Sequence, residues 1–251
     1  MLHHIDLSQI LFLDIECVSE RGDFSQLDET KQALWRLKAR SVLRKYDEPL
    51  TDEEVEEAYI NGAAVYAEFG KIICISVGGF RRDKITKKLQ FRLKSFFGDD
   101  EKQLLQDFAE MVKQHYNDPK KRFFCGHNIK EFDMPYICRR MIVNYIPLPE
   151  TLQVAGKKPW ELAHYLDTME LWKFGDRKAY TSLKLLAATL GFPSPKDDID
   201  GSEVGRVYWN EGDVDRIARY CEKDVAATAQ LYLRYHLMPL LEDEQIEFSE
   251  I

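Results

Sequence analysis

The segment from Ile10 to Cys17 constrains the fold more than any other part of the chain. It reads Ile-Leu-Phe-Leu-Asp-Ile-Glu-Cys, an apolar run interrupted only by Asp14 and Glu16. A run of this length and composition is typical of a buried central strand. Side chains two residues apart on a strand point to the same face, so Asp14 and Glu16 can share one cation. The alternative is a strand end at which both acids are solvated.

The residues after this strand predict an insertion and then a hairpin. Residues 20–70 are charged and rich in helix-favouring side chains, which predicts a helical insertion after the first strand. This stretch is longer than a connection between two strands requires, and the simplest interpretation is a helical pair packed on the sheet. Two β-rich runs follow, separated by the polar turn Arg81–Lys84, and they predict a hairpin at Lys71–Phe80 and Lys87–Phe97.

The second half of the chain alternates helical and strand patterns. Helices are expected at Asp99–Tyr116, Glu131–Val143 and Ser182–Leu190, and from Asp213 to about His236, with short strands at Phe123–Cys125 and His164–Thr168. Gly191 closes the third helix and Pro239 stops the last, while Pro193–Gly205 reads as a surface loop. We therefore expect one α/β domain over residues 1–251, a mixed sheet flanked by helices.

Composition limits the protein class but decides little about function. The formal net charge of -8 argues against a protein that coats DNA broadly without sequence preference. The five cysteines are odd in number and contain no C-x-x-C pair, so they read as reduced core residues. No apolar run reaches the length of a membrane span, and the first ten residues lack an export signal. We expect a soluble, cytoplasmic protein.

Two further acidic elements lie far from the first strand. Asp133 sits near a predicted helix start, where an acid is common because it favours the helix dipole. Tyr220 and Asp224 are four residues apart and therefore share one face of the last helix, as many pairs do by chance. Each element alone is weak. Together they give the order D-x-E, N-x-x-x-F-D and Y-x-x-x-D across separate parts of the chain.

With these three motifs the sequence resembles the superfamily of proofreading-type exonucleases that carry four acidic ligands and a tyrosine. It most closely resembles the stand-alone predicted 3′-5′ exonucleases related to the exonuclease domain of family B DNA polymerases. The resemblance covers roughly residues 9–238. Further matching stretches are Leu166-Asp167-Thr168, the run SLKLLAATLG and the segment KDDIDGSEV.

The resemblance implies a ribonuclease-H-like fold and a hydrolytic enzyme. In that family the positions of Asp14, Glu16, Asp133 and Asp224 hold two divalent cations, Mg²⁺ or Mn²⁺. Asp14 is expected to bridge both ions, Glu16 and Asp224 to bind the one that activates water, and Asp133 to bind the other. Tyr220 is expected to orient the water, because a phenol with a pKa near ~10 is a poor base at neutral pH.

Substrate contacts follow less directly. The resemblance assigns Asn128 to the terminal nucleotide, and the aromatic faces of Phe132 and Tyr136 can stack on bases, although at least one of the two is expected in the core. His127 and His164 are interpreted as structural, since a tyrosine occupies the motif position that a general-base histidine would take. Two groups of basic residues could guide a phosphate backbone or simply be solvated: Lys120, Lys121, Arg122, Lys130, Arg139 and Arg140, and Lys173, Arg177 and Lys178.

The expected activity is removal of nucleotides from the 3′ ends of DNA, preferably single-stranded. An RNA exonuclease on the same fold is the first alternative, because the metal chemistry ignores the sugar. A non-catalytic nucleic-acid-binding domain is a second, which the intact set of four acids and Tyr220 disfavours. An endonuclease is a third, disfavoured by the Y-x-x-x-D motif. Since no polymerase sequence accompanies these residues, we expect a replication role to need a separate partner. Repair or end trimming, with or without a partner, is equally open.

Overall fold

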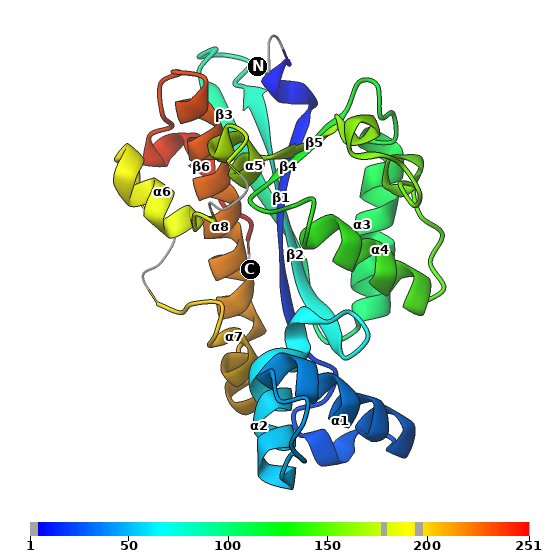
Figure 1. Ribbon diagram of the computed structural model, residues 1–251. Coiled ribbons are helices and arrows are strands. Elements are labelled where there is room, and N and C mark those ends of the chain that lie inside the picture. The colour runs from blue at the N-terminus through cyan, green and yellow to red at the C-terminus, as the bar shows by residue number, and fades with distance from the viewer. Residues whose placement is uncertain (1–4, 177–179, 194–197, 251) are drawn as a thin grey trace.

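A mixed sheet of six strands forms the centre of the fold (Figure 1). The computed structural model describes residues 5–176, 180–193 and 198–250. The strand order is β5-β4-β1-β2-β3-β6. The strands are β1 (Ile10–Ser19), β2 (Gly70–Arg82), β3 (Leu89–Phe97), β4 (Phe123–Gly126), β5 (Tyr165–Asp167) and β6 (Ile246–Glu247). The strand predicted around Asp14 is therefore central, with β2 antiparallel on one side and β4 parallel on the other.

The pairing of β1 ends early on its β4 side. Among the described residues, β1 pairs with β4 only over Ile10–Phe12, whereas its ladder with β2 continues to Ser19. The chain leaves β4 at Gly126, where a β-carbon would lie 3.0 Å from the main-chain oxygen of Leu13. This close approach requires glycine. The acidic half of β1 therefore has an open edge beside the point where β4 ends.

Helices cover both faces of the sheet (Figure 1). On one face lie α3 (Glu101–His115) and α4 (Asp133–Val143), and on the other lies α8 (Val214–Tyr235). The shorter helices after β5 are α5 (Thr168–Lys173), α6 (Leu183–Leu190) and α7 (Val204–Arg206). Ser182 and Asp213, the predicted helix starts, cap α6 and α8, and Gly191 ends α6 in a left-handed conformation.

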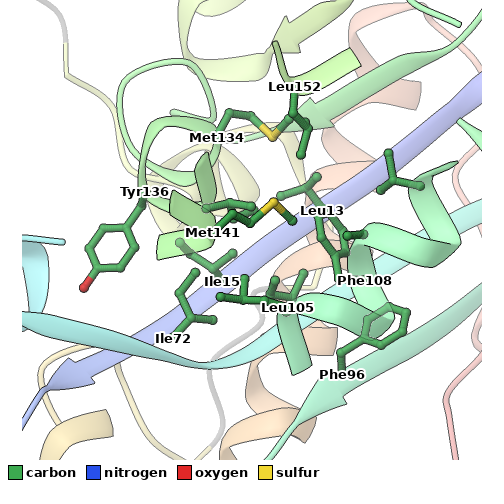
Figure 2. Packing of buried hydrophobic residues seen from close by; sticks show 14 of the residues in the cluster. Leu13, Ile15, Ile72, Phe96, Leu105, Phe108, Met134, Tyr136, Met141 and Leu152 are labelled. Carbon is green, nitrogen blue, oxygen red and sulfur yellow. The ribbon is translucent and has the colours of Figure 1, made fainter. Parts of the chain in front are cut away.

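Alternation along β1 separates two cores. Leu13 and Ile15 pack with α3 and α4, together with Phe108 and Met141 (Figure 2), whereas Phe12 packs with α8. Because successive side chains alternate between faces, Asp14 and Glu16 must lie on the same face as Phe12. The two acids are thus directed toward α8.

The insertion after β1 consists of helices with a core of their own. Its main elements are α1 (Glu29–Leu43) and α2 (Asp52–Gly62), and they lie beyond one end of the sheet (Figure 1). Trp35 and Tyr59 are fully buried between them, in contact with each other edge to face. Asp28 caps α1, and Thr51 with Glu54 forms a capping box on α2. The helical insertion predicted after the first strand is present, with its two main helices at Glu29–Leu43 and Asp52–Gly62.

Three details of the prediction need correction. Strand β2 continues through Arg82, so the hairpin turn lies at residues 83–88 and not at Arg81–Lys84. Strand β6 has two residues and was not predicted. Within Pro193–Gly205, residues 194–197 lie outside the described residues, but Ile199 and Val204 are buried, so this part is not a simple surface loop. None of the described helices is long and apolar enough to cross a membrane.

Candidate active site

The acids of β1 meet helix α8 through Cys221. A carboxylate oxygen of Asp14, a carboxylate oxygen of Glu16 and the sulfur of Cys221 all lie within 4.8 Å of one another. The Cys221 thiol is 3.4 Å from the main-chain oxygen of Asp14 and 3.7 Å from its Oδ2. Cys221 is fully buried, Glu16 is 8% exposed and Asp14 is half-buried. This is the face of β1 to which the alternation directs both acids.

Asp133 approaches the same acids from the open edge of β1. It is the first residue of α4 and is 2% exposed. The backbone N–H of Ile15, the residue between the two strand acids, lies near this carboxylate and favours its charged form. Burial raises the pKa of Asp133 to about 7, and the negative charges of Asp167 and Asp224 add to this shift. The early end of β4 makes room for this contact.

Helix α8 brings the remaining two residues. Tyr220 is 8% exposed and donates its hydroxyl proton to the carboxylate of Asp224, one helical turn further along. Burial raises the pKa of Tyr220 far above its ordinary value, and the charges of Asp224 and Glu16 raise it further. The phenol therefore keeps its proton at neutral pH.

The four carboxylates repel one another. Burial and the charge of Asp133 raise the pKa of Asp14 well above its usual range, and the charges of Asp224 and Glu16 contribute as well. Protonation or a bound cation relieves such repulsion. Carboxylate oxygens are the donors that Mg²⁺ and Mn²⁺ prefer, so the donor set fits these ions.

A buried carboxylate fixes the segment that leads to Asp133. Asp167, at the end of β5, is 3% exposed and accepts backbone N–H groups at four positions. Two of them, Asn128 and Lys130, lie in the loop after β4, each 3.1 Å away. The other two, Met169 and Glu170, begin α5. Asp167 thus joins the loop after β4 to the first turn of α5.

Asn128 has an unusual conformation within this segment. Its φ of 68° lies in the left-handed region, which asparagine tolerates better than most residues. Its side-chain oxygen is buried and has no hydrogen-bond partner among the described residues. Its neighbour His127 contacts Thr168 through Nδ1 and the main-chain oxygen of Thr181 through Nε2, each at 2.9 Å.

Comparison with known protein families matches residues 65–248, more than half of the chain, to the family described as predicted 3′-5′ exonuclease related to the exonuclease domain of PolB. The chain belongs to this exonuclease family. The matched range contains Asp133, Tyr220 and Asp224, whereas Asp14 and Glu16 precede it. A search of curated proteins found no match to this exonuclease-family chain.

Among solved structures, the exonuclease-family chain is similar to the family B DNA polymerase of the hyperthermophilic archaeon Pyrobaculum calidifontis. The TM-score is 0.54 at 16% sequence identity, and the alignment covers 91% of this chain and 24% of the polymerase. The chain thus spans about a quarter of the polymerase's length. At this identity the likeness concerns the fold, and it confirms the predicted ribonuclease-H-like arrangement of a mixed sheet flanked by helices.

The structure separates the two aromatic residues expected near the exonuclease substrate. Tyr136 is 1% exposed, belongs to the core shown in Figure 2 and donates its hydroxyl to the main-chain oxygen of Ala64 at 2.8 Å. Its predicted contact with bases is therefore wrong, because the ring face is covered by protein. Phe132 immediately precedes Asp133 and is half-buried. Only Phe132 retains a partly accessible ring.

The basic residues predicted near Asp133 differ in their exposure and in their partners. Arg140 is 6% exposed and forms a two-point ion pair with Glu101, so it is a core residue and no phosphate contact. Lys130 pairs with Glu170, 2.5 Å away, while Arg139 is exposed. Arg177 and Lys178 of the second group lie outside the described residues.

His164, Cys221 and Asp167 are buried residues whose roles the sequence indicates to different degrees. His164 is 4% exposed and bonds to the main-chain oxygen of Thr151 at 3.0 Å, in agreement with a structural role. The sequence indicates only a core position for Cys221, and it places Asp167 in a matching stretch without a predicted contact. Asp167 follows a short strand and precedes a helix, a pattern that signals an N-cap. No local pattern distinguishes Cys221 from an ordinary core cysteine.

Proposed function

We propose that this chain is a divalent-cation-dependent 3′-5′ exonuclease that releases nucleoside monophosphates from the 3′ ends of DNA, preferably single-stranded. One observation carries the proposal. Asp14 and Glu16 from β1, Asp133 from α4, and Tyr220 with Asp224 from α8 act on one another electrostatically, although they are far apart in sequence. A stable fold has no use for four mutually repelling acids, so their convergence is best explained by a bound cation.

The positions of the acids suggest how they would divide the work. Asp14 has Glu16 and Asp224 as charged neighbours on the α8 side and Asp133 on the open edge of β1, which supports a bridging role for Asp14. Glu16 and Asp224 would then hold one ion and Asp133 the other. Two such ions, Mg²⁺ or Mn²⁺, would supply Lewis acidity for the attacking and departing oxygens of a phosphodiester.

Tyr220 would position the attacking water. Because its pKa is raised, the phenol stays protonated at neutral pH and does not serve as a base. Its hydroxyl instead provides a fixed hydrogen-bonding group beside Asp224. Tyr220 as a whole is 8% exposed, so replacement by phenylalanine would keep the packing of the ring and remove only the hydroxyl.

Asn128 and Phe132 are the proposed contacts to the terminal nucleotide. The unpaired side-chain oxygen of Asn128 supports a ligand contact, because buried polar atoms are otherwise nearly always hydrogen-bonded. The half-buried ring of Phe132 could stack on a base without sequence preference. Relationship to the exonuclease domain of PolB supports DNA as the substrate.

A time course with 5′-labelled linear oligonucleotides and an internally labelled circle tests the proposal. Linear single-stranded DNA, RNA of the same sequence, and circular single-stranded DNA would be compared in Mg²⁺, in Mn²⁺ and in EDTA. The proposal predicts a ladder of shortening DNA products with either metal, slower loss of RNA, and intact circles. Faster degradation of RNA would show that RNA, and not DNA, is the preferred substrate. Cleavage of circles would show that the enzyme is an endonuclease. Tyr220→Phe should keep the metal requirement and lower the rate.

A further inference from the structure

The β2–β3 hairpin concentrates positive charge in an acidic chain. Residues 81–94 include seven basic side chains and a single acid, Asp83, whereas the whole chain has a formal net charge of -8. The basic residues are Arg81, Arg82, Lys84, Lys87, Lys88, Arg92 and Lys94, and all seven are exposed. Such a local excess creates a positive potential that the net charge of the chain conceals.

The hairpin presents these charges from a defined turn. The β2–β3 ladder continues without interruption to the pair Arg82 and Leu89. Beyond it, the carboxylate of Asp83 accepts the backbone N–H groups of Ile85 at 3.0 Å and Thr86 at 2.6 Å. These two hydrogen bonds to the Asp83 side chain stabilise the turn. The lysines of this turn therefore extend from a hydrogen-bonded backbone.

Acidic neighbours neutralise only part of this charge. Glu247 of β6 contacts Arg81 at 2.6 Å and Arg92 at 4.0 Å. Within the described residues, Arg82, Lys84, Lys87 and Lys88 form no ion pair, and we call these four the hairpin tip. Asp6 adds one exposed acid near Arg82. The hairpin tip thus remains strongly cationic.

The hairpin tip lies at the end of the sheet opposite the helical insertion (Figure 1). In the β1–β2 ladder, Asp14 is opposite Ser76, and Arg82 is six residues further along β2. At the rise of a β-strand, these six residues span about 20 Å. Stacked nucleotides rise about 3.4 Å each, so roughly six of them would bridge the distance between the candidate active site and the hairpin tip.

We propose that the hairpin tip is a second, sequence-independent contact for the phosphate backbone of the strand whose 3′ end lies in the candidate active site. This inference rests on the proposed exonuclease function. Lysine and arginine contacts to phosphates position a strand without reading its bases. They suit an enzyme that must hold any sequence. Substrates too short to reach the tip would gain nothing from it.

Charge reversal at the tip tests the proposal through binding. The variant Arg82→Glu/Lys84→Glu/Lys88→Glu leaves Lys87 and the bonds of Asp83 in place, and it removes one long bond of the turn, from the Arg82 guanidinium to the main-chain oxygen of Lys87 at 3.4 Å. It would be combined with Asp14→Asn, so that the DNA stays intact during fluorescence-anisotropy titrations with a single strand of about 20 nucleotides. Each lost phosphate contact lowers the slope of log K against log[salt] by about 0.7 for a single strand, so the slope should become shallower by about 2. We expect affinity at low salt to fall at least about tenfold.

A matched variant controls for net charge. Arg40→Glu/Lys102→Glu/Lys184→Glu makes the same charge change at exposed residues of α1, α3 and α6 that form no ion pair within the described chain. It should leave the affinity and the salt slope close to those of the parent. An equal loss in both triple variants would overturn the proposal, since it would indicate a general charge effect. Unchanged binding in the hairpin variant would overturn it as well.

Hydrolysis by the otherwise wild-type enzyme gives the second readout. The hairpin variant should lose kcat/KM on the long strand and keep it on an oligonucleotide of about four nucleotides, which cannot reach the tip. Equal losses on both lengths would contradict a remote contact. If no variant degrades nucleic acid but the binding difference persists, the hairpin surface stands and the proposed exonuclease function fails.

Discussion

The sulfur of Cys221 lies 3.7 Å from Oδ2 of Asp14 and 3.4 Å from the main-chain oxygen of the same residue. This contact joins helix α8 to the central strand at the point where the acids converge. The thiol is a donor to Asp14 and partly offsets the rise in the pKa of that carboxyl. Cys221 also lies beside Glu16, so it is in a position to orient both strand acids.

Replacement of Cys221 should therefore weaken metal binding. Cys221→Val keeps the apolar volume and removes the donor, so we expect Mn²⁺ affinity to fall by up to about tenfold, or ~1.4 kcal/mol. Cys221→Ser keeps a donor and should stay within about threefold of wild type. The affinity would be read from the rise in melting temperature with Mn²⁺ concentration. Equal affinities in the valine and serine variants would exclude an orienting role for the thiol.

The stability of the metal-free protein should depend on pH through Asp133. Its pKa is raised to about 7, above the ordinary value of 3.8, so the folded state binds a proton more tightly than the unfolded state. This contribution is fully present below about pH 4 and is lost as the pH rises through about 7. At pH 8 the folded wild type carries a buried charge at Asp133 that Asp133→Asn lacks, so the variant should be more stable in EDTA and melt at a higher temperature. The gain in the free energy of unfolding should be up to about 4 kcal/mol.

The same variant should gain little at pH 4, where the carboxyl of wild type is already protonated. Saturating Mn²⁺ at pH 8 should reverse the order, because only wild type retains the full set of ligands. A stability difference that is the same at pH 4 and pH 8 would contradict the raised pKa of Asp133.

Loss of Asp167 should cost both stability and activity. Asp167→Ala leaves the part-buried N–H groups of Asn128 and Lys130 without their acceptor and removes the cap of α5. We expect a loss of about 2–4 kcal/mol in the free energy of unfolding. Asp213→Ala removes the exposed cap of α8 and should cost only about 1 kcal/mol. Denaturant titrations would compare the two, and equal costs would refute the joining role of Asp167.

The buried ion pair of Arg140 and Glu101 should be structural. Arg140→Met leaves Glu101 charged and partly unpaired in the core, which should cost about 3–5 kcal/mol. Arg36→Met breaks an exposed pair with Asp52 and should cost less than about 1 kcal/mol. DNA affinity of the folded fraction should be unchanged in both variants. A loss of DNA affinity in Arg140→Met but not in Arg36→Met would show that Arg140 contacts the substrate.

The sequence predicts the strands and long helices because their patterns are local. The alternation around Asp14 assigns both strand acids to one face, and the caps at Ser182 and Asp213 mark helix starts that the structure reproduces. Strand β6 escapes prediction because its two residues pair with β3 only through tertiary contacts.

Local sequence patterns do not predict which side chains near the candidate site are buried by long-range contacts. Phe132 and Tyr136 are four residues apart and thus share a helical face, so spacing alone cannot tell which ring is covered. The hydroxyl partner of Tyr136 is Ala64 in the insertion, far away in sequence. Arg140 looks like part of a basic run because its partner Glu101 precedes it by 39 residues. In each case the deciding contact is long-range.

The central claim is that the converging acids perform the chemistry. The most direct measurement is the rate of shortening of a 5′-labelled single-stranded DNA in Mg²⁺ or Mn²⁺ for wild type, Asp14→Asn and Asp107→Asn. Asp107 is an exposed acid of α3 and serves as the matched control. We predict a metal-dependent ladder for wild type and Asp107→Asn, and at least about a hundredfold slower shortening by Asp14→Asn, or ~2.7 kcal/mol. A ladder that persists unchanged in Asp14→Asn would contradict the account.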